Sequence, residues 1–214
     1  MESIEQRVPK IIDILRQLYP RSQTALKFKN PLQILVATVL SAQCTDKKVN
    51  EVTPGLFKKY SRVEDFAEAD LKDLEKEIRS TGFYRNKSKN IRAAAQKMVA
   101  DFSGKVPSNM SDLLTLPGVA RKTANIVLSS AFHKAQGIAV DTHVKRLSQR
   151  LGLSDQKNPD KIEQDLMKIV PKEEWLHFNY RLVNHGRKIC QARKPLCDDC
   201  RLSQLCLSAD LGHS

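Results

Sequence analysis

The sequence predicts an all-α protein, and three observations support this fold class. Apolar residues recur every three or four positions along most of the 214 residues, which is the period of an amphipathic helix. Residues typical of helix starts stand just before these apolar runs. Convincing alternation of apolar and polar residues is absent, because Ile138-Ala139-Val140 is too short to count as a strand. A chain of this length forms one or two domains.

The predicted helices follow one another with short linkers. The first has one apolar face made of Ile4, Val8, Ile11, Ile12, Leu15 and Leu18. Asn30-Pro31 indicates an N-cap followed by proline at the first helical position. The helix that it starts, through about Gln43, is apolar nearly all round and is expected to be a buried central helix. Further helices are predicted near 45–59, 70–80, 86–101, 111–116, 120–132, 141–151, 159–170 and 172–189.

The charge balance favours a polyanionic partner. Lys and Arg number 36 and Asp and Glu 24, which gives a formal net charge of +12. Such a surplus is typical of proteins that bind nucleic acid. The longest uncharged run, residues 30–45, contains polar side chains and is short for a membrane span. The first fifteen residues lack the apolar core of a signal peptide. We therefore expect an intracellular protein of the cytoplasm or nucleoid.

Four of the five cysteines lie close together near the C-terminus. Cys190, Cys197, Cys200 and Cys206 have the spacing C-x6-C-x2-C-x5-C. Four thiolates can hold one zinc ion or a [4Fe–4S] cluster. Structural zinc sites more often show two C-x2-C pairs, so a single pair favours the cluster without excluding zinc. Cys44 stands alone and is interpreted as a small core hydrophobe.

A tight turn between two predicted helices is a candidate phosphate site. Leu116-Pro117-Gly118-Val119-Ala120 precedes a helix whose free N–H groups and positive dipole end suit an anion. An ordinary helical hairpin is the alternative. Lys122 lies in the first turn of that helix. A helix N-terminus and burial both disfavour an ammonium ion, so Lys122 could supply a neutral, nucleophilic amine. A solvated or phosphate-binding lysine is the simpler alternative.

Asp141 follows an apolar stretch and precedes a helical pattern. It is an ideal N-cap, and a carboxylate held there could also stabilise a nearby cation or move protons. His143 is interpreted as structural or phosphate-contacting, because nothing in the sequence pairs it with a nucleophile.

These motifs together resemble the endonuclease III family of helix-hairpin-helix, iron–sulfur DNA glycosylases. The resemblance covers about Ile4 to Cys206. It depends on the cysteine spacing and on four segments in the order and at the separations of that family: LSAQCTD (40–46), TGFYRNKSKNI (81–91), LPGVARKTAN (116–125) and AVDTHVKRLSQRLGL (139–153).

The resemblance implies two helical domains with a DNA groove between them. Residues 24–134 would form a six-helix barrel with the hairpin, and residues 1–23 and 135–214 an iron–sulfur domain. It implies a [4Fe–4S] cluster held by the four clustered cysteines. It also implies a monomeric bifunctional glycosylase and AP lyase of base excision repair. The substrate would be double-stranded DNA that contains oxidised or ring-saturated pyrimidines or abasic sites.

The resemblance also implies residue roles. Lys122 corresponds to the catalytic lysine that forms a Schiff base, and Asp141 to the catalytic aspartate. Gln43 corresponds to a side chain inserted where the flipped base was, Phe83 to a wedge on the opposite side, and Asp46 to a helix start that lines the pocket. The remaining expected DNA contacts are Gly118, Ala120, Thr123, His143 and Arg187, the last from the basic segment between 181 and 201.

Two residues depart from the family pattern. Ala120 stands where the hairpin usually has a second glycine, and a left-handed backbone there would cost about 1–2 kcal/mol. Phe83 replaces what is more often an aliphatic wedge. Two other functions are weighed: a monofunctional mismatch adenine glycosylase, which lacks the lysine present here as Lys122, and a non-catalytic DNA-binding module with a cluster.

Overall fold

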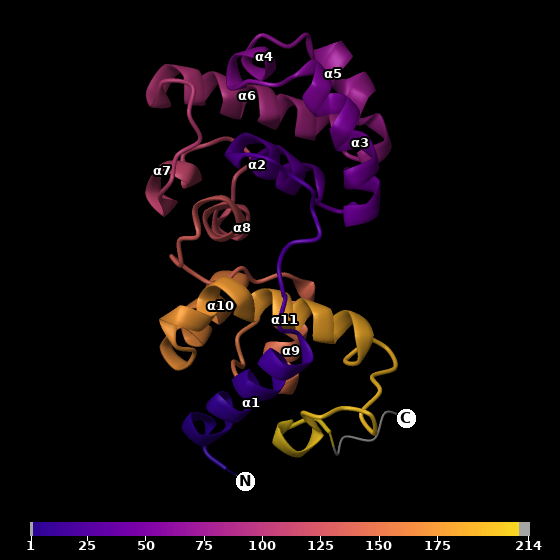
Figure 1. Cartoon of the computed structure of the whole chain (residues 1–214), viewed down its shortest axis with the longest axis vertical. Helices are drawn as coiled ribbons and strands as arrows, with labels where there is room; N and C mark the ends of the chain where they lie inside the picture. Colours follow the sequence, from indigo (N-terminus) through magenta and orange to yellow (C-terminus); the bar gives the residue numbers. More distant parts are fainter. Residues whose placement is uncertain (1, 210–214) are drawn as a thin grey trace. The chain divides into compact units, whose positions relative to one another are not determined.

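The computed structural model describes residues 2–209, and the helices in this part of the chain are joined without any strand (Figure 1). The predicted all-α class is confirmed. The chain divides into two compact units. The central unit is Thr24–Gln136, and the terminal unit is formed by the chain on either side of it. The sequence placed this division at residue 134. Met1 and residues 210–214, which belong to the predicted iron–sulfur domain, lie outside the described residues.

The central unit is built around one apolar helix. Its helices are α2 (Pro31–Leu40), α3 (Asp46–Lys59), α4 (Val63–Ala67), α5 (Leu71–Ile78), η1 (Arg79–Thr81), α6 (Tyr84–Phe102), α7 (Met110–Leu114) and α8 (Arg121–Phe132). Ile34, Ala37 and Leu40 of α2 have no solvent exposure, which confirms the predicted buried helix. α2 ends at Leu40, not at Gln43, because the backbone of Gln43 is left-handed (φ 52°).

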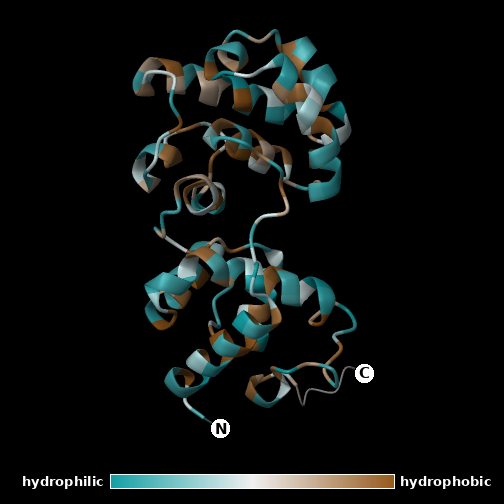
Figure 2. Cartoon of the chain, in the orientation of Figure 1, coloured by the Kyte–Doolittle hydropathy of each residue, from teal (hydrophilic) through white to brown (hydrophobic). Residues whose placement is uncertain are grey.

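The terminal unit joins the first helix to the C-terminal half of the chain. Its helices are α1 (Ile4–Leu18), α9 (Thr142–Arg150), α10 (Pro159–Ile169), η2 (Lys172–Glu174), α11 (Trp175–Lys188) and η3 (Ser203–Leu205). Ile11 and Leu15 of α1 share a core with Leu147 of α9 and with Phe178 and Leu182 of α11. Most helices carry both brown and teal along their length, as amphipathic helices do (Figure 2).

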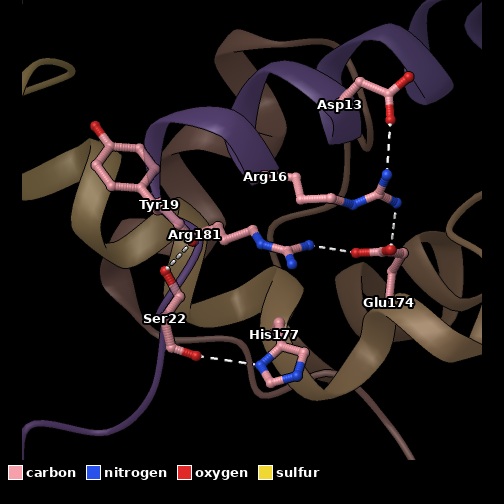
Figure 3. A network of polar contacts seen from close by, with 7 residues as sticks. All are labelled: Asp13, Arg16, Tyr19, Ser22, Glu174, His177 and Arg181. Carbon is pink, nitrogen blue, oxygen red and sulfur yellow. Dashed lines mark hydrogen bonds and ion pairs between the residues drawn. The ribbon is translucent and has the colours of Figure 1, made fainter.

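Polar contacts also fasten α1 to α11 in the terminal unit (Figure 3). Glu174 accepts hydrogen bonds from Arg16 of α1 at 2.6 Å and from Arg181 of α11. Beyond the end of α1, His177 Nδ1 lies 3.2 Å from the carbonyl oxygen of Ser22. Glu174 and Arg181 are buried, and the second contact of Glu174, with Arg16, connects this buried pair to the N-terminal helix.

Local signals explain where most helices begin. Asn30 caps α2 with its side-chain oxygen, as predicted, and Asp70 and Asn158 cap α5 and α10 in the same way. The sequence missed α4, because five residues are too few to show a helical period. Within residues 2–209, no helix combines the length and the apolar character needed to cross a membrane.

Candidate active site

The predicted hairpin lies between α7 and α8. Gly118 has φ +77°, a left-handed conformation that favours glycine. A Cβ atom added there would lie 2.8 Å from Cβ of Asn90 on α6. Gly118 is therefore required both by its backbone angle and by the close approach of α6.

Ala120 does not carry the strain that the sequence allowed for. Its backbone is extended, with φ −89° and ψ 168°, and it is the N-cap residue of α8. Any L residue adopts this conformation, so the expected cost of 1–2 kcal/mol does not arise. The alanine also provides no side-chain cap to α8.

Lys122 lies in the first turn of α8, as predicted, and its side chain is exposed. Its amino group therefore lies at the surface of the free chain, and the burial considered from the sequence is absent. Thr123, the next residue, lines a cavity together with Gly118.

Asp141 begins α9 as the predicted N-cap. Its Oδ1 accepts hydrogen bonds from the backbone N–H groups of His143 at 2.9 Å and Val144 at 2.8 Å. Both of these bonds use the same oxygen, so they fix the carboxylate while Oδ2 takes no part in the cap. Asp141 is half-buried at the end of the buried segment Ile138-Ala139-Val140.

His143 packs against α11 and is held in one orientation. Its Nδ1 lies 3.1 Å from Nη2 of Arg146, and Arg146 also donates to the carbonyl oxygens of Gly186 and Cys190. Burial lowers the pKa of His143, and the charges of Arg146 and Arg187 lower it further against the opposing effect of Asp141. Since Arg146 can only donate, Nδ1 accepts in this contact, and a neutral ring then carries its proton on Nε2.

The predicted insertion residues both lie at sharp turns of the central unit. Gln43 follows α2 and is exposed, and Phe83 precedes α6 and is 62% exposed. Both have left-handed backbones, with φ 52° and 49°. Asp46 is the first residue of α3, as predicted, and is half-buried. Cys44 is half-buried and packs against the apolar core of this unit.

A cavity of about 210 Å³ opens between these turns and the hairpin. Gln43, Phe83, Gly118 and Thr123 all line it. Asn90 and the buried Lys87, which no sequence pattern marked as site residues, are also among its lining residues. Lys87 stands among exposed basic residues in TGFYRNKSKNI, so no local signal separates it from a surface lysine. The available clue to its place in the site was its position four residues after Phe83.

The four clustered cysteines line one small pocket of the terminal unit, of about 30 Å³. Arg150 Nη1 donates to Sγ of Cys190 at 3.2 Å, and the thiol of Cys206 donates to the carbonyl oxygen of Arg150 at 3.3 Å. Burial raises the pKa of the Cys200 and Cys206 thiols. Among the described residues, no three His, Cys, Asp or Glu side chains are gathered closely enough for a single metal ion.

The basic segment between 181 and 201 is less uniform than its sequence indicates. Arg181 is 5% exposed and pairs with Glu174, so it does not contribute to a basic surface. The other basic side chains of the segment are exposed: Arg187, Lys188, Arg193, Lys194 and Arg201. Arg150 holds the loop that carries two of them through the carbonyl oxygens of Gln191 and Ala192.

Comparison with known proteins gives the class of this chain. Residues 36–172 match a family model described as HhH-GPD superfamily base excision DNA repair protein. Endonuclease III of Synechocystis sp. is 54% identical over 209 residues, which cover 98% of this chain and 95% of that protein. Endonuclease III of Bacillus subtilis is 45% identical, with coverage of 91% and 89%.

Solved structures agree. A trapped covalent intermediate of an endonuclease III with DNA superposes with a TM-score of 0.93 at 42% identity, covering 99% of both chains. A non-covalent endonuclease III–DNA complex gives 0.92 at the same identity, covering 99% of this chain and 98% of that one. The chain therefore belongs to the endonuclease III family. It is a bifunctional DNA glycosylase and AP lyase of base excision repair.

Proposed function

We propose that this enzyme removes oxidised or ring-saturated pyrimidines from double-stranded DNA and then cuts the abasic site, with Lys122 as nucleophile. The observation that carries the proposal is the position of Lys122, exposed in the first turn of α8 behind a hairpin fixed by Gly118. The trapped covalent intermediate of the 42% identical relative supports a covalent step. The enzyme acts as a monomer, the state that the family resemblance implies.

The reaction begins with the damaged nucleotide rotated out of the helix, since its C1′ cannot be reached inside a duplex. The neutral amine of Lys122 then attacks C1′, and the bond between C1′ and the base breaks as the base leaves with the bonding electrons. The attached amine loses one proton, and the C1′–O4′ bond then breaks as O4′ takes up a proton, which opens the sugar and gives a protonated Schiff base. Removal of a proton from C2′ then expels the 3′ phosphate by β-elimination, which cuts the strand.

We assign Asp141 the role of stabilising the positive charge that develops on the sugar and helping to move protons. Its Oδ1 is fixed by two backbone N–H groups, at 2.9 and 2.8 Å, which leaves Oδ2 for this work. A carboxylate held by its own helix needs no reorganisation when the charge appears. Capping and catalysis are thus compatible in one side chain.

Gln43 and Phe83 are assigned to the gap that the rotated base leaves. Both project from turns with left-handed backbones, and Phe83 is 62% exposed. An exposed aromatic ring can stack on an unpaired base, a contact worth about 1–3 kcal/mol. The hairpin residues, with Thr123, are assigned to backbone phosphates, and so are His143 and Arg187.

We further propose that Cys190, Cys197, Cys200 and Cys206 hold a [4Fe–4S] cluster. All four line one pocket, and the guanidinium of Arg150 faces Cys190, where thiolate charge would gather. The spacing contains a single C-x2-C pair, where structural zinc sites more often show two, and this favours the cluster over zinc. When bound, the cluster supplies four iron–thiolate bonds that cross-link the basic loop.

Borohydride trapping tests the enzymatic proposal. The wild-type chain should form a covalent band with a duplex that contains an abasic site and with one that contains an oxidised thymine. Lys122→Gln should bind both duplexes without forming a band, while Lys76→Gln, which removes an exposed lysine of α5, should trap normally. A normal band from Lys122→Gln would refute the nucleophile. Base release by the wild-type chain without any band would favour a monofunctional glycosylase, and binding alone a non-catalytic module.

Iron and acid-labile sulfide analysis tests the cluster. About four of each per chain are expected, with a loss of both in Cys200→Ser and normal content in Cys44→Ser. Zinc without sulfide would contradict the assignment.

A further inference from the structure

Two turns of the central unit share an unusual backbone. Four non-glycine residues among those described have positive φ: Gln43, Phe83, Ser103 and His133. Ser103 and His133 end α6 and α8, where a left-handed residue commonly closes a helix. Gln43 and Phe83 do not end helices in this way, since Gln43 lies beyond the C-cap of α2 and Phe83 precedes α6. Their strain needs another support.

Lys87 supplies that support. Its Nζ donates to the carbonyl oxygen of Leu40, the last residue of α2, and to that of Thr81, the last residue of η1, both at 2.8 Å. Leu40 lies three residues before Gln43, and Thr81 two residues before Phe83. The backbone N–H of Lys87 also donates to the carbonyl oxygen of Phe83 at 3.1 Å. One side chain therefore fastens the roots of both turns.

The surroundings make this a fixed connection. Lys87 is 5% exposed, and its ammonium meets the carbonyl ends of two helices, which carry partial negative charge. Burial lowers the pKa of Lys87. Lys87 and Asn90 of α6 line the 210 Å³ cavity together with Gln43 and with Phe83, the residue just before α6.

We propose that Lys87 is a positioning residue that holds Gln43 and Phe83 at a fixed separation across this cavity, so that both enter the duplex as one preassembled unit. The inference rests on the insertion roles given under the proposed function. A flexible pair would have to be ordered at each encounter with a lesion, and a displacement of about 1 Å can slow a reaction about 10²-fold.

The test is single-turnover excision of a ring-saturated thymine from a duplex, measured well below each variant's melting temperature. Lys87→Met should slow excision by about 10²-fold. In the background Gln43→Ala plus Phe83→Ala, the same substitution should change the rate by less than about twofold, because the residues that it positions are already gone. Lys97→Met removes a lysine three turns along α6, paired with Asp101, and should leave the rate unchanged within about twofold.

Comparing the effect of Lys87→Met in the two backgrounds separates a positioning role from general destabilisation. If Lys87→Met slowed both backgrounds by the same factor, Lys87 would only support the fold and the proposal would be overturned. If Gln43→Ala plus Phe83→Ala left excision unchanged, insertion itself would be wrong and the proposal would fall with it, although borohydride trapping of the wild type would still stand. If Lys87→Met does not fold, Lys87→Gln, which keeps a donor within reach of one carbonyl, gives the same comparison.

Discussion

Replacement of Glu174 by glutamine should destabilise the terminal unit by about 3 kcal/mol at neutral pH. Removing one partner of a buried ion pair costs about 3–5 kcal/mol, because the other charge is left buried and unpaired. The side chains of Glu174 and Arg181 are 11% and 6% exposed, so their pair falls in this class. The contact with Arg16, whose side chain is 52% exposed, adds less than about 1 kcal/mol. Glutamine keeps an acceptor oxygen for Arg181, so the expected loss of stability lies at the lower end of the range of about 3–5 kcal/mol.

Urea unfolding followed by tryptophan fluorescence measures this loss. Trp175, the only tryptophan of the chain, directly follows Glu174 and donates to the carbonyl oxygen of Val170 at 2.8 Å, so its emission reports on the terminal unit. With a urea slope of about 2 kcal/mol per M, the midpoint should fall by about 1.5 M. The exposed neighbour Glu173, changed to glutamine, should shift stability by less than about 0.5 kcal/mol. Equal shifts for the two variants would refute the reasoning.

The same pair predicts a pH dependence. Burial raises the pKa of Glu174, but the hydrogen bonds and charges of Arg16 and Arg181 outweigh it and hold the pKa below its ordinary value of 4.5. The folded state thus favours the carboxylate, and the resulting stability is present above about pH 4.5 and is lost as the pH falls through the folded-state pKa. The difference between wild type and Glu174→Gln should shrink in acid. An undiminished difference at about pH 3 would contradict the assignment.

Three further predictions concern catalysis, the hairpin and DNA binding. Asp141→Asn, which still caps α9, should lower base excision by about 10²–10⁴ with its melting temperature kept, and a change in melting temperature alone would make Asp141 only a cap. Gly118→Ala, whose Cβ would lie 2.8 Å from Asn90, should lose about 1–3 kcal/mol in thermal unfolding, whereas Ala120→Gly should change stability by only a few tenths. DNA affinity should fall steeply and linearly with salt on logarithmic axes, and a flat response would rule out dominant phosphate contacts.

The features predictable from sequence are those with a local cause. Helix periods and cap residues such as Asn30, Asp70 and Asp141 act through neighbours two to four positions away, so their outcome can be predicted without a structure. The burial of α2 was equally predictable from the sequence, because a helix that is apolar on all sides is not stable at a protein surface.

The features that the sequence could not reveal depend on contacts between distant segments. Lys87 and Arg181 look like surface charges in a basic chain, yet Lys87 reaches a carbonyl 47 residues away and Arg181 is buried against Glu174. Burial of a charge is decided by whether the fold supplies partners for it, and these partners come from elements that no local pattern connects.

Ala120 illustrates how a departure from a family pattern acquires meaning only with backbone angles. A positive φ favours glycine, and in this hairpin the residue with positive φ is Gly118, whereas Ala120 is extended. Serine or aspartate at position 120 would cap α8 with a side-chain oxygen, as Asp141 caps α9, and would stabilise the helix by about 1 kcal/mol. The same oxygen would occupy N–H groups that a phosphate needs and would place another acceptor beside Lys122. Under the phosphate contact proposed for this hairpin, a small residue without an acceptor leaves the N–H groups of α8 available to the DNA backbone, and the missing cap would then be a loss of stability that serves binding.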